Sequence, residues 1–491
     1  MDKLINNAIT NSNRIAVISN QTPYSYAILL EKSKAIAHFL LNGKTDLEEA
    51  RVAFLISPSF DYTAVLWGIW RAGGIAVPLC EKHPLPSITF VIEDTEAEII
   101  IYEKSFESLL LPLASKVSRF LVLDIIHKKG GELLFTPAPS RRALILYTSG
   151  TTGNPKGVVT THHNIEAQIT SLTTSWEWSK EDHILNILPM HHVHGIINIL
   201  MCALWSGACC SFLPKFSPED VFSEFKKGKL TIFMAVPTIY FKLIAHWKLL
   251  SETEKKEISK ALIKFRLMVS GSAALPISVL ADWKTLSGHV LLESYGMTEI
   301  GMAISNPYRG ERKPGFIGVP LQGVTVQLAD ENNKPVEAGL QGEIQIKGPN
   351  VFLEYWGKPE ATQDVFTSEG WFKTGDIAVF EQGSYRILGR NSIDIIKSGG
   401  YKISALEIEE VLRQHPDIDE CAVVGIPDVE WGELIAASII TQKPNFDLKE
   451  LTKWLKTKLP NYKIPRKYRL DHELPRNVMG KVTKNELKSK F

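Results

Sequence analysis

One run of small, polar and basic residues, at 147–157, constrains this chain more than any other stretch. It reads YTSGTTGNPKG and follows the apolar segment at 143–146, which is typical of a buried strand. Backbone amides and hydroxyls in such a turn can surround phosphate oxygens, and glycines let a ligand approach the backbone. Lys156 adds a mobile charge, although Gly157 follows it where the Walker pattern requires Ser or Thr. A glycine-rich surface turn is the alternative, but the whole run favours a phosphate-binding loop.

Strand-like and helix-like patterns alternate over most of the chain, which at 491 residues is longer than one core usually supports. Helical spacing at 25–41 and 61–71 alternates with strand-like runs at 14–18, 51–56, 75–79, 98–102 and 120–124. This alternation predicts parallel sheets covered by helices, with ligands bound at the carboxyl ends of the strands. Four later strands end in polar or glycine-rich loops, so we expect them to share one cleft: 183–188, 231–235, 265–270 and 290–293.

The sequence pattern changes beyond residue 310, where short strand-like runs are separated by Gly, Pro and Asp. We therefore expect an α/β protein whose large N-terminal domain, at 1–389, combines two parallel-sheet α/β subdomains with a small β-barrel at about 310–389. A polar connection follows at 389–394. The remaining residues, 395–491, predict a small α+β C-terminal domain of roughly 100 residues.

Composition excludes several classes of function. The net charge of +1 gives no reason to expect binding to nucleic acid or to an anionic membrane surface. The longest apolar run, at 196–204, covers about nine residues and is too short to span a bilayer. The five cysteines have no metal-ligand spacing, which indicates buried thiols in a reducing compartment. With no targeting pattern at the N-terminus, we expect a cytoplasmic enzyme without a membrane span; its oligomeric state is not predicted.

Further motifs follow the loop in a fixed order: YGMTE at 295–299, TGD at 374–376, GR at 389–390 and Lys481. In this order the chain resembles the acyl-adenylate-forming superfamily, which includes acyl-CoA synthetases, luciferases and the adenylation domains of peptide synthetases. The resemblance covers essentially the whole chain. Within the superfamily the chain is most similar to malonyl-CoA synthetases, through the runs at 188–195, 213–218, 235–240, 269–275 and 474–481.

The resemblance implies an acid–CoA ligase that uses ATP, Mg²⁺ and CoA on a small carboxylic acid. The acid attacks the α-phosphorus of ATP, releases pyrophosphate and forms an acyl-adenylate, from which CoA then takes the acyl group. Positive charge is needed where these anions meet. For the second step the family rotates a mobile C-terminal domain about the hinge at 390–394. Relatives often carry Asp or Lys two residues after the arginine, whereas here Ser392 stands there and Asp394 comes two residues later.

The resemblance also assigns roles to individual residues. Lys481 is implied to supply charge at the α-phosphate, Thr298 to bond that phosphate, Glu299 to bind Mg²⁺, and His194 to gate the acyl side. The residues implied to bind ATP are Thr148, Ser149, Gly150, Thr151, Thr152, Gly153, Lys156, Gly271, Ser272, Ala273, Glu293, Ser294, Tyr295, Gly296, Met297, Asp376 and Arg390. Those implied to contact the acid are His194, Lys242, Ser270, Ser272, Ser294 and Met302, and those implied to contact CoA are Lys397, Ser398, Gly399, Gly400 and Tyr401.

Several of these residues have simpler interpretations when taken alone. Thr298 and Glu299 could be the cap and first-turn acid of a helix, Asp376 a turn residue, and Lys481 a solvated surface lysine. A metal could also be suspected at the three neighbouring histidines, His191, His192 and His194. They share one short loop without an acidic partner nearby in sequence, so we expect no metal there.

The identity of the acid depends on residue 294. Malonyl-CoA synthetases commonly carry arginine before the YGMTE motif, as part of the site for the distal carboxylate, but this chain carries Ser294. Because an unpaired buried charge is costly, Lys242 and either Ser270 or Ser272 would have to compensate. We favour malonate or methylmalonate bound in a rearranged pocket. The alternatives are a ligase for short or medium-chain monocarboxylates, an enzyme that loads a carrier protein, and a non-catalytic nucleotide sensor.

Overall fold

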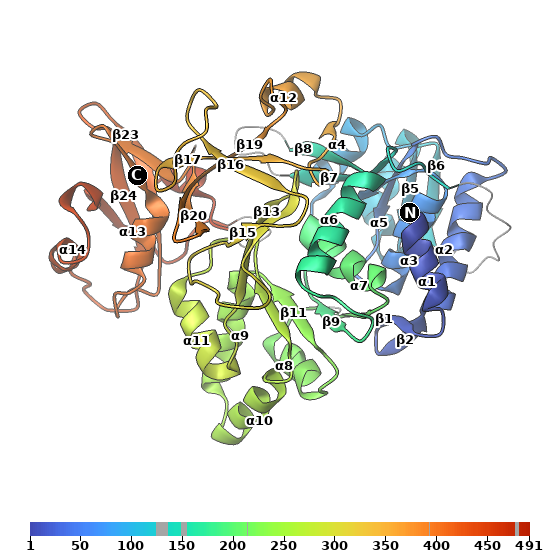
Figure 1. The fold of residues 1–491 in the computed structure, drawn as a ribbon, viewed down its shortest axis with the longest axis horizontal. Coiled ribbons are helices and arrows are strands. Elements are labelled where there is room, and N and C mark those ends of the chain that lie inside the picture. Colours follow the sequence, from blue (N-terminus) through green and yellow to red (C-terminus); the bar gives the residue numbers. More distant parts are fainter. Residues whose placement is uncertain (124–135, 149–154, 214, 392, 477–480) are drawn as a thin grey trace.

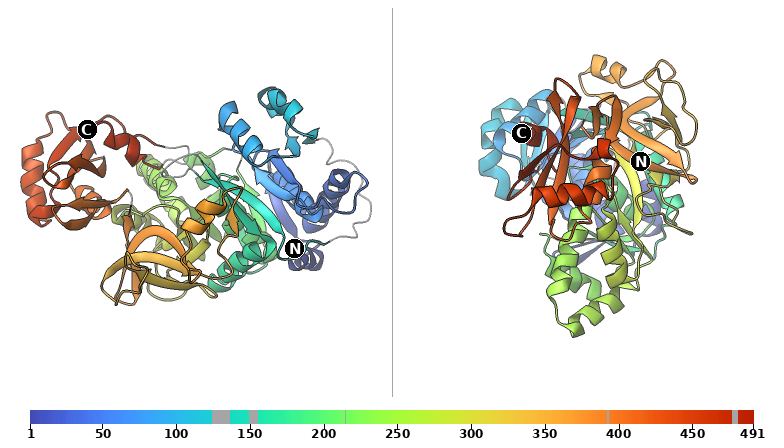
Figure 2. Two further views of the ribbon diagram at one scale, coloured as in Figure 1. Left: turned by 90° about the horizontal axis from the view of Figure 1, so that it is seen from above. Right: turned by 90° about the vertical axis from the view of Figure 1, so that its left-hand side faces the viewer.

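The computed structural model describes residues 1–123, 136–148, 155–213, 215–391, 393–476 and 481–491. The chain forms an elongated particle with the N-terminal subdomain at one end and the C-terminal domain at the other (Figure 1). Seen from above, the same order holds, and the two termini lie at opposite ends (Figure 2). In the part of the chain that is described, no helix is both long and apolar enough to cross a membrane.

The first subdomain is a seven-stranded sheet in the order β18-β8-β7-β4-β3-β5-β6. Its central strands are parallel, as the alternating pattern predicts, and β8 adds antiparallel to β7. The strands are β3 (Arg51–Leu55), β4 (Ile75–Pro78), β5 (Ile99–Tyr102), β6 (Arg119–Val122), β7 (Arg142–Thr148), β8 (Lys156–Thr161) and β18 (Glu354–Tyr355). Its helical segments are α2 (Tyr26–Leu41), α3 (Phe60–Arg71), α4 (Leu85–Asp94), α5 (Glu107–Leu110) and the 3₁₀ turns η1 (Lys104–Phe106) and η2 (Leu111–Lys116).

The second subdomain is a nine-stranded sheet in the order β15-β14-β13-β12-β11-β9-β10-β1-β2. Its strands are β1 (Ile15–Ser19), β2 (Thr22–Ser25), β9 (His183–Asn186), β10 (Cys209–Phe212), β11 (Ile232–Ala235), β12 (Leu267–Ser270), β13 (Leu292–Met297), β14 (Gly301–Ser305) and β15 (Val319–Pro320). Its helices are α1 (Asp2–Thr10), α6 (His162–Ser175), the π-helical η4 (His194–Met201), α7 (Cys202–Trp205), α8 (Pro218–Lys226), α9 (Pro237–Leu249), α10 (Glu252–Leu262) and α11 (Ile277–Ser287). The first strand of the chain therefore belongs to the second sheet, beside β10.

Beyond residue 310 the chain forms a four-stranded antiparallel sheet in the order β16-β17-β19-β20. The strands are β16 (Thr325–Ala329), β17 (Gln341–Lys347), β19 (Phe372–Glu381) and β20 (Ser384–Arg390), with α12 (Pro359–Asp364) before β19. β19 is one continuous strand of ten residues, although Gly375 and Asp376 lie within it and the sequence predicts only short strands here. The expected barrel is an open path of strands, since β16 and β20 form no pair among the described residues.

The C-terminal domain is an α+β unit, as its sequence predicts. Its sheet runs β22-β21-β24-β23, with β25 parallel to β24. The elements are β21 (Ile395–Ser398), β22 (Tyr401–Ser404), α13 (Ala405–Leu412), β23 (Glu420–Asp428), β24 (Gly432–Ile440), α14 (Leu448–Lys456), the 3₁₀ turn η5 (Asn461–Lys463), β25 (Lys467–Leu470) and α15 (Lys484–Lys488).

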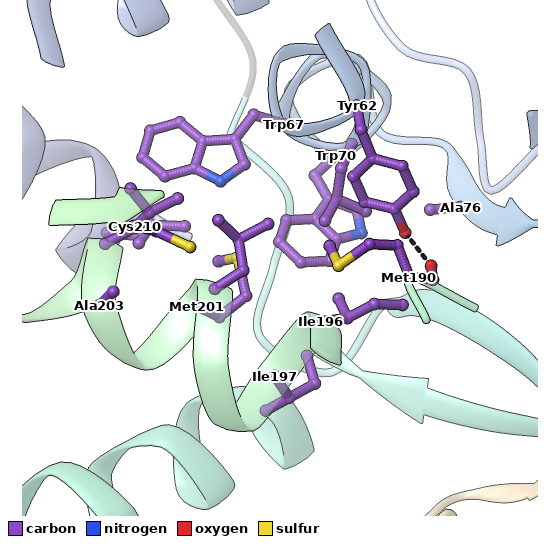
Figure 3. Close-up of a cluster of buried hydrophobic side chains, with 14 of the residues drawn as sticks. Tyr62, Trp67, Trp70, Ala76, Met190, Ile196, Ile197, Met201, Ala203 and Cys210 are labelled. Carbon is purple, nitrogen blue, oxygen red and sulfur yellow. Dashed lines mark hydrogen bonds between the residues drawn. The ribbon is translucent and has the colours of Figure 1, made fainter. Parts of the chain in front are cut away.

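The two large sheets share one hydrophobic core. Trp67 and Trp70 of α3 pack against Ile196 and Met201 of η4, so helices from different subdomains are buried against each other (Figure 3). Trp70 Nε1 donates to the Ala143 carbonyl oxygen at 2.7 Å, at an irregularity in the pairing of β7 with β8. This bond holds the strand that leads into the loop at 147–157.

We expect the two tryptophans of α3 to respond differently to loss of the indole nitrogen. Both are fully buried, but Trp67 Nε1 has no partner among the described residues, whereas Trp70 Nε1 satisfies the Ala143 carbonyl. Trp70→Phe should therefore cost about 1–3 kcal/mol more unfolding free energy than the matched control Trp67→Phe. Chemical denaturation followed by circular dichroism measures the difference. Equal losses would show that the indole bond does not stabilise β7.

Candidate active site

The carboxyl ends of four parallel strands meet at one edge of the second sheet. β9, β11, β12 and β13 are neighbours, and Ser270 at the end of β12 pairs with Ala235 on one side and Glu293 on the other. These four strand ends are neighbours, as the prediction of a shared cleft requires. The loops that follow them carry the polar side chains of the candidate site.

His194 and Ser294 face each other across Gly271 at this edge. A Cβ built on Gly271 would lie 3.3 Å from Ser294 Oγ and 3.6 Å from His194 Cε1, so only glycine leaves the space between them free. His194 Nδ1 lies 2.9 Å from Ser272 Oγ, and Ser272 is held at φ 66°, a left-handed conformation that is costly outside glycine. The loop after β12 is therefore strained in a way that orients the imidazole.

Two buried polar atoms at this point have no hydrogen-bond partner among the described residues: His194 Nε2 and Ser294 Oγ. Burial and the nearby Lys481 lower the pKa of His194 to about 4, so its imidazole is neutral at pH 7. In the tautomer in which His194 Nδ1 accepts a hydrogen bond from the Ser272 hydroxyl, the ring proton is on Nε2, which can then donate a hydrogen bond. Because buried polar groups are normally satisfied, the pair fits a polar ligand between η4 and β13.

The remaining acyl-side candidates are distributed differently. Ser270 Oγ is also buried without a described partner, but strand alternation places it on the face of β12 that carries Met268, opposite the core shared with η4. Lys242 lies on the exposed face of α9, with Nζ 5.9 Å from the Phe216 ring centroid. Met302 packs on β14 in the shared core.

Four imidazoles gather at the junction of the two subdomains. His83, which follows β4 and which sequence reasoning missed, has its ring centroid 5.9 Å from that of His191, and the His191 and His192 rings lie 4.0 Å apart. Burial lowers the pKa of His191 to about 2 and, together with Lys481, that of His192 to about 4. These rings are neutral at pH 7, and no cluster of metal-binding side chains occurs in the part of the chain described here.

The phosphate end of the site joins Lys156, Tyr355 and Glu299. Lys156 Nζ lies 4.8 Å from the centroid of the Tyr355 ring, and the Tyr355 hydroxyl donates to Glu299 Oε1 at 2.9 Å. Burial raises the pKa of Glu299, and the Tyr355 hydrogen bond opposes that rise. Sequence reasoning missed Tyr355, whose contact depends on β18 pairing with β8.

Thr298 and Glu299 lie in the turn between β13 and β14, so the helix-cap interpretation of these residues is wrong. Tyr295, Gly296 and Met297 continue β13 instead of forming a loop. Of the residues expected in the glycine-rich loop, Thr148 and Lys156 are paired across β7 and β8. Ser149, Gly150, Thr151, Thr152 and Gly153 lie outside the described residues.

A second cluster surrounds Asp376. The Tyr295 hydroxyl donates to Asp376 Oδ2 at 2.6 Å, while Arg390 Nε lies 3.1 Å from Asp376 Oδ1 and its terminal nitrogen donates to the Thr374 carbonyl. Burial opposes the charge on Arg390, but Asp376, Tyr295 and Glu299 together outweigh burial and raise the pKa of that guanidinium. The carboxylate is thus held in one orientation, which suits an acceptor for sugar hydroxyls. Glu293 is not part of this cluster. Its Oε1 accepts a hydrogen bond from the backbone nitrogen of Gly315 at 2.9 Å, and burial raises the pKa of Glu293 to about 8.

The C-terminal domain brings Lys481 to the cleft. The pKa of Lys481 is lowered by loss of hydration and by Arg390, and Asp376 opposes that shift. Two contacts join the C-terminal domain to the N-terminal domain. Lys402 Nζ lies 2.7 Å from Glu331 Oε1, and Glu410 accepts a hydrogen bond from the backbone nitrogen of Ile277 at the start of α11. In the segment expected to contact CoA, Ser398 is buried and the other four residues are exposed at the β21–β22 hairpin: Lys397, Gly399, Gly400 and Tyr401.

These residues fit a magnesium nucleotide without a protein-only metal cage. A single buried carboxylate, Glu299, lies beside the lysine and tyrosine of the phosphate end, and Mg²⁺ is usually bound by one or two carboxylates together with substrate phosphates. Asp376 and Lys481 lie on the side toward the hinge. The arrangement can bind a nucleotide between the two domains.

Family models match most of the chain: one described as AMP-binding enzyme over residues 5–356, and one described as AMP-binding enzyme C-terminal domain over residues 407–481. The chain is 42% identical to mitochondrial malonate–CoA ligase of Homo sapiens, covering 98% of this chain and 90% of the relative. It is 38% identical to malonate–CoA ligase of Arabidopsis thaliana, over 98% and 87%.

Solved structures give the same result. ATP-bound MatB of Rhodopseudomonas palustris is 31% identical with a TM-score of 0.90, covering 99% of this chain and 98% of that one. The o-succinylbenzoate CoA synthetase of Bacillus subtilis in complex with ATP and magnesium ion is 28% identical with a TM-score of 0.87, over 99% of each chain. The fold, the order of motifs and these matches agree, and the chain belongs to the AMP-binding enzyme family.

Proposed function

We propose that this protein is an ATP-dependent ligase that joins malonate to CoA through an acyl-adenylate. The relatives named malonate–CoA ligase cover nearly the whole chain and support this choice. The observation that carries the proposal is the pair of buried, unpartnered polar atoms, His194 Nε2 and Ser294 Oγ, that flank Gly271 beside Lys481. A small acid that carries a second polar group at its far end can form a hydrogen bond with each of these two atoms.

In the first step one carboxylate oxygen of the acid attacks the α-phosphorus of ATP. The bond from that phosphorus to the bridging oxygen breaks, and pyrophosphate leaves with its electron pair. Lys481 stabilises the negative charge that develops at the α-phosphate, and Lys156 holds the β- and γ-phosphates. Bound Mg²⁺, held by Glu299, supplies further neutralisation of the phosphate oxygens. Asp376 and Tyr295 orient the nucleoside.

In the second step the CoA thiol, as it loses its proton, attacks the acyl carbon and AMP leaves. The structure has Lys481 at the cleft and the segment at 397–401 exposed on the far hairpin. We therefore propose that this arrangement serves the first step and that rotation about 390–394 exchanges the two segments for the second. Residues Gly399 and Gly400 have positive φ, which lets a thin chain such as pantetheine approach the backbone.

The distal carboxylate of malonate would meet neutral donors in place of the arginine. His194 and Ser294 can each donate one hydrogen bond, and hydrogen bonds to a charged acceptor are stronger than neutral ones. Lys242 does not contribute, because it lies on the exposed face of α9. The pocket therefore binds a dicarboxylate by directed hydrogen bonds close to the positive charge of Lys481.

A ligase for short or medium-chain monocarboxylates is the second candidate, and the absence of the arginine favours it. Loading of a carrier protein is a further alternative for the second step. The cellular compartment is proposed as the cytoplasm from the sequence, whereas the vertebrate relatives are named mitochondrial.

Removing the amine of Lys481 should separate the two half-reactions. We expect Lys481→Ala to reduce pyrophosphate exchange by about 10²-fold or more, because one preorganised charge at the reacting phosphate is lost. Thioester formation from a supplied acyl-adenylate and CoA should stay within about twofold of the parent, since Lys481 has then finished its role. Equal losses in both assays would contradict the two-arrangement mechanism.

Removing the hydroxyl of Ser294 should weaken malonate selectively. One hydrogen bond to a charged group contributes about 1.5–3 kcal/mol, so Ser294→Ala should raise the KM for malonate about tenfold or more. Ser270→Ala is the matched control, because its hydroxyl is also buried but lies on the opposite face of β12. Kinetics are compared across malonate, methylmalonate, acetate, butyrate and octanoate. A kcat/KM for octanoate above that for malonate would overturn the malonate proposal.

Removing the hydroxyl of Tyr355 should weaken the magnesium site. Tyr355→Phe keeps the ring beside Lys156 but deletes the donor to Glu299, so we expect the Mg²⁺ concentration for half-maximal adenylation to rise about tenfold. Calorimetric titration of ATP at several Mg²⁺ concentrations gives a second measurement that does not depend on turnover. Tyr385→Phe, in the same hydrophobic cluster, is the control. An unchanged Mg²⁺ dependence would remove Tyr355 from the site.

A further inference from the structure

Lys484 is buried, although a lysine ammonium is strongly hydrated when exposed. Its side chain is 9% exposed, and Nζ lies 2.6 Å from Asp394 Oδ1 and 2.6 Å from Glu409 Oε1. Burial alone would lower the pKa of Lys484, but the two carboxylates outweigh it and raise that pKa. Lys484 therefore stays charged, and it stands three residues after Lys481 in the chain.

Asp394 links this buried charge to the hinge. Its second oxygen, Oδ2, accepts the backbone nitrogen of Arg390 at 3.1 Å, and its own nitrogen donates to the Arg390 carbonyl at 2.7 Å. The carboxylate thus closes the turn at 390–394. The turn packs directly on Gly389, where an added Cβ would lie 2.4 Å from Asp394 Cβ. Arg390 in turn binds Asp376 in the cleft.

Glu409 links the same charge to the body of the C-terminal domain. Its Oε1 also accepts the Val423 nitrogen on β23 at 2.8 Å, and its Oε2 accepts from Arg413 at 3.0 Å. Lys484 and Arg413 are therefore joined through Glu409, and Arg413 also lies 3.5 Å from Glu410. Ion pairs of this kind often add little net stability compared with apolar packing, so their directional bonds are better explained by a role in fixing how segments are joined.

We propose that Lys484 is a positioning residue for Lys481. By pairing with the hinge residue Asp394, Lys484 couples the position of Lys481 to the conformation of the hinge. This inference rests on the role proposed above for Lys481. Three residues of extended chain span at most about 11 Å, so anchoring Lys484 confines Lys481. Asp394 is the last residue of the hinge and Glu409 lies beyond it, so both move with Lys484. The Asp394–Arg390 contact spans the hinge, so rotation releases it while the ion network stays intact.

To test this inference, adenylation and thioester formation are measured separately in the Lys484→Met variant. We expect the kcat of adenylation, measured by pyrophosphate exchange, to fall about tenfold or more, because a misplaced charge stabilises the transition state poorly. The KM for ATP and the rate of thioester formation from a supplied acyl-adenylate should stay within about twofold. Lys484→Arg, which keeps the charge, should recover part of the loss. Lys463→Met is the matched control, since it removes another ion pair of this domain, with Glu407, that involves neither Asp394 nor Glu409.

Equal losses in both half-reactions would overturn the inference, as would unchanged adenylation in Lys484→Met. Should Lys484→Met fail to fold, Asp394→Asn keeps the shape and an acceptor for the Arg390 nitrogen. A thermal melt verifies that Asp394→Asn is folded, and its adenylation should fall while thioester formation is retained. Lys481→Ala is assayed alongside. If that variant keeps adenylation, the proposed role of Lys481 fails; if it loses adenylation and Lys484→Met does not, only the present inference fails.

Discussion

The packing of α3 against η4 is the interaction on which the rest of the active site depends. It buries Trp67 and Trp70 between the two large sheets and so brings the end of β7 toward the ends of β9 to β13. Neither sheet alone holds both the phosphate end and the acyl end of the site. The π-helical segment η4 begins at His194, so the same helix that completes the core also presents the imidazole to the cleft. Stability and function therefore share one element, as is frequent for π-helical segments.

The positively charged side chains of the candidate site come from separate parts of the chain. The imidazoles near the acyl end are neutral because burial and Lys481 lower their pKa values, so they donate without adding charge. The cations are Lys156, Arg390 and Lys481, of which Lys156 and Lys481 are the two proposed to contact phosphates. This division suits a reaction in which a carboxylate approaches a phosphate, because repulsion is greatest at the phosphorus. It also explains how a serine can stand at 294, since the acyl side depends on directed donors.

Sequence reasoning predicted the site unevenly, for physical reasons. The motif residues Tyr295, Asp376 and Arg390 come together, because Asp376 and Arg390 pair across β19 and β20 and the hydroxyl of Tyr295 on β13 reaches Asp376. The exposure of Lys242 was not predicted, because it depends on which face of α9 is buried, and that face is set by Tyr240 and Leu243. Tyr355 was missed because β18 is only two residues long and pairs with β8 nearly 200 residues earlier.

The sequence by itself determined the α/β class and the order of the subdomains, and it predicted the residues proposed to bind phosphate. These follow from local periodicity and from short motifs whose residues carry their chemistry wherever the chain places them. Only the tertiary structure decided which buried groups face one another: Ser294 with His194, Tyr355 with Glu299, and Lys484 with both Asp394 and Glu409. Such pairings depend on strand register, on which face of an element is buried and on how domains dock, and no local pattern specifies these long-range choices.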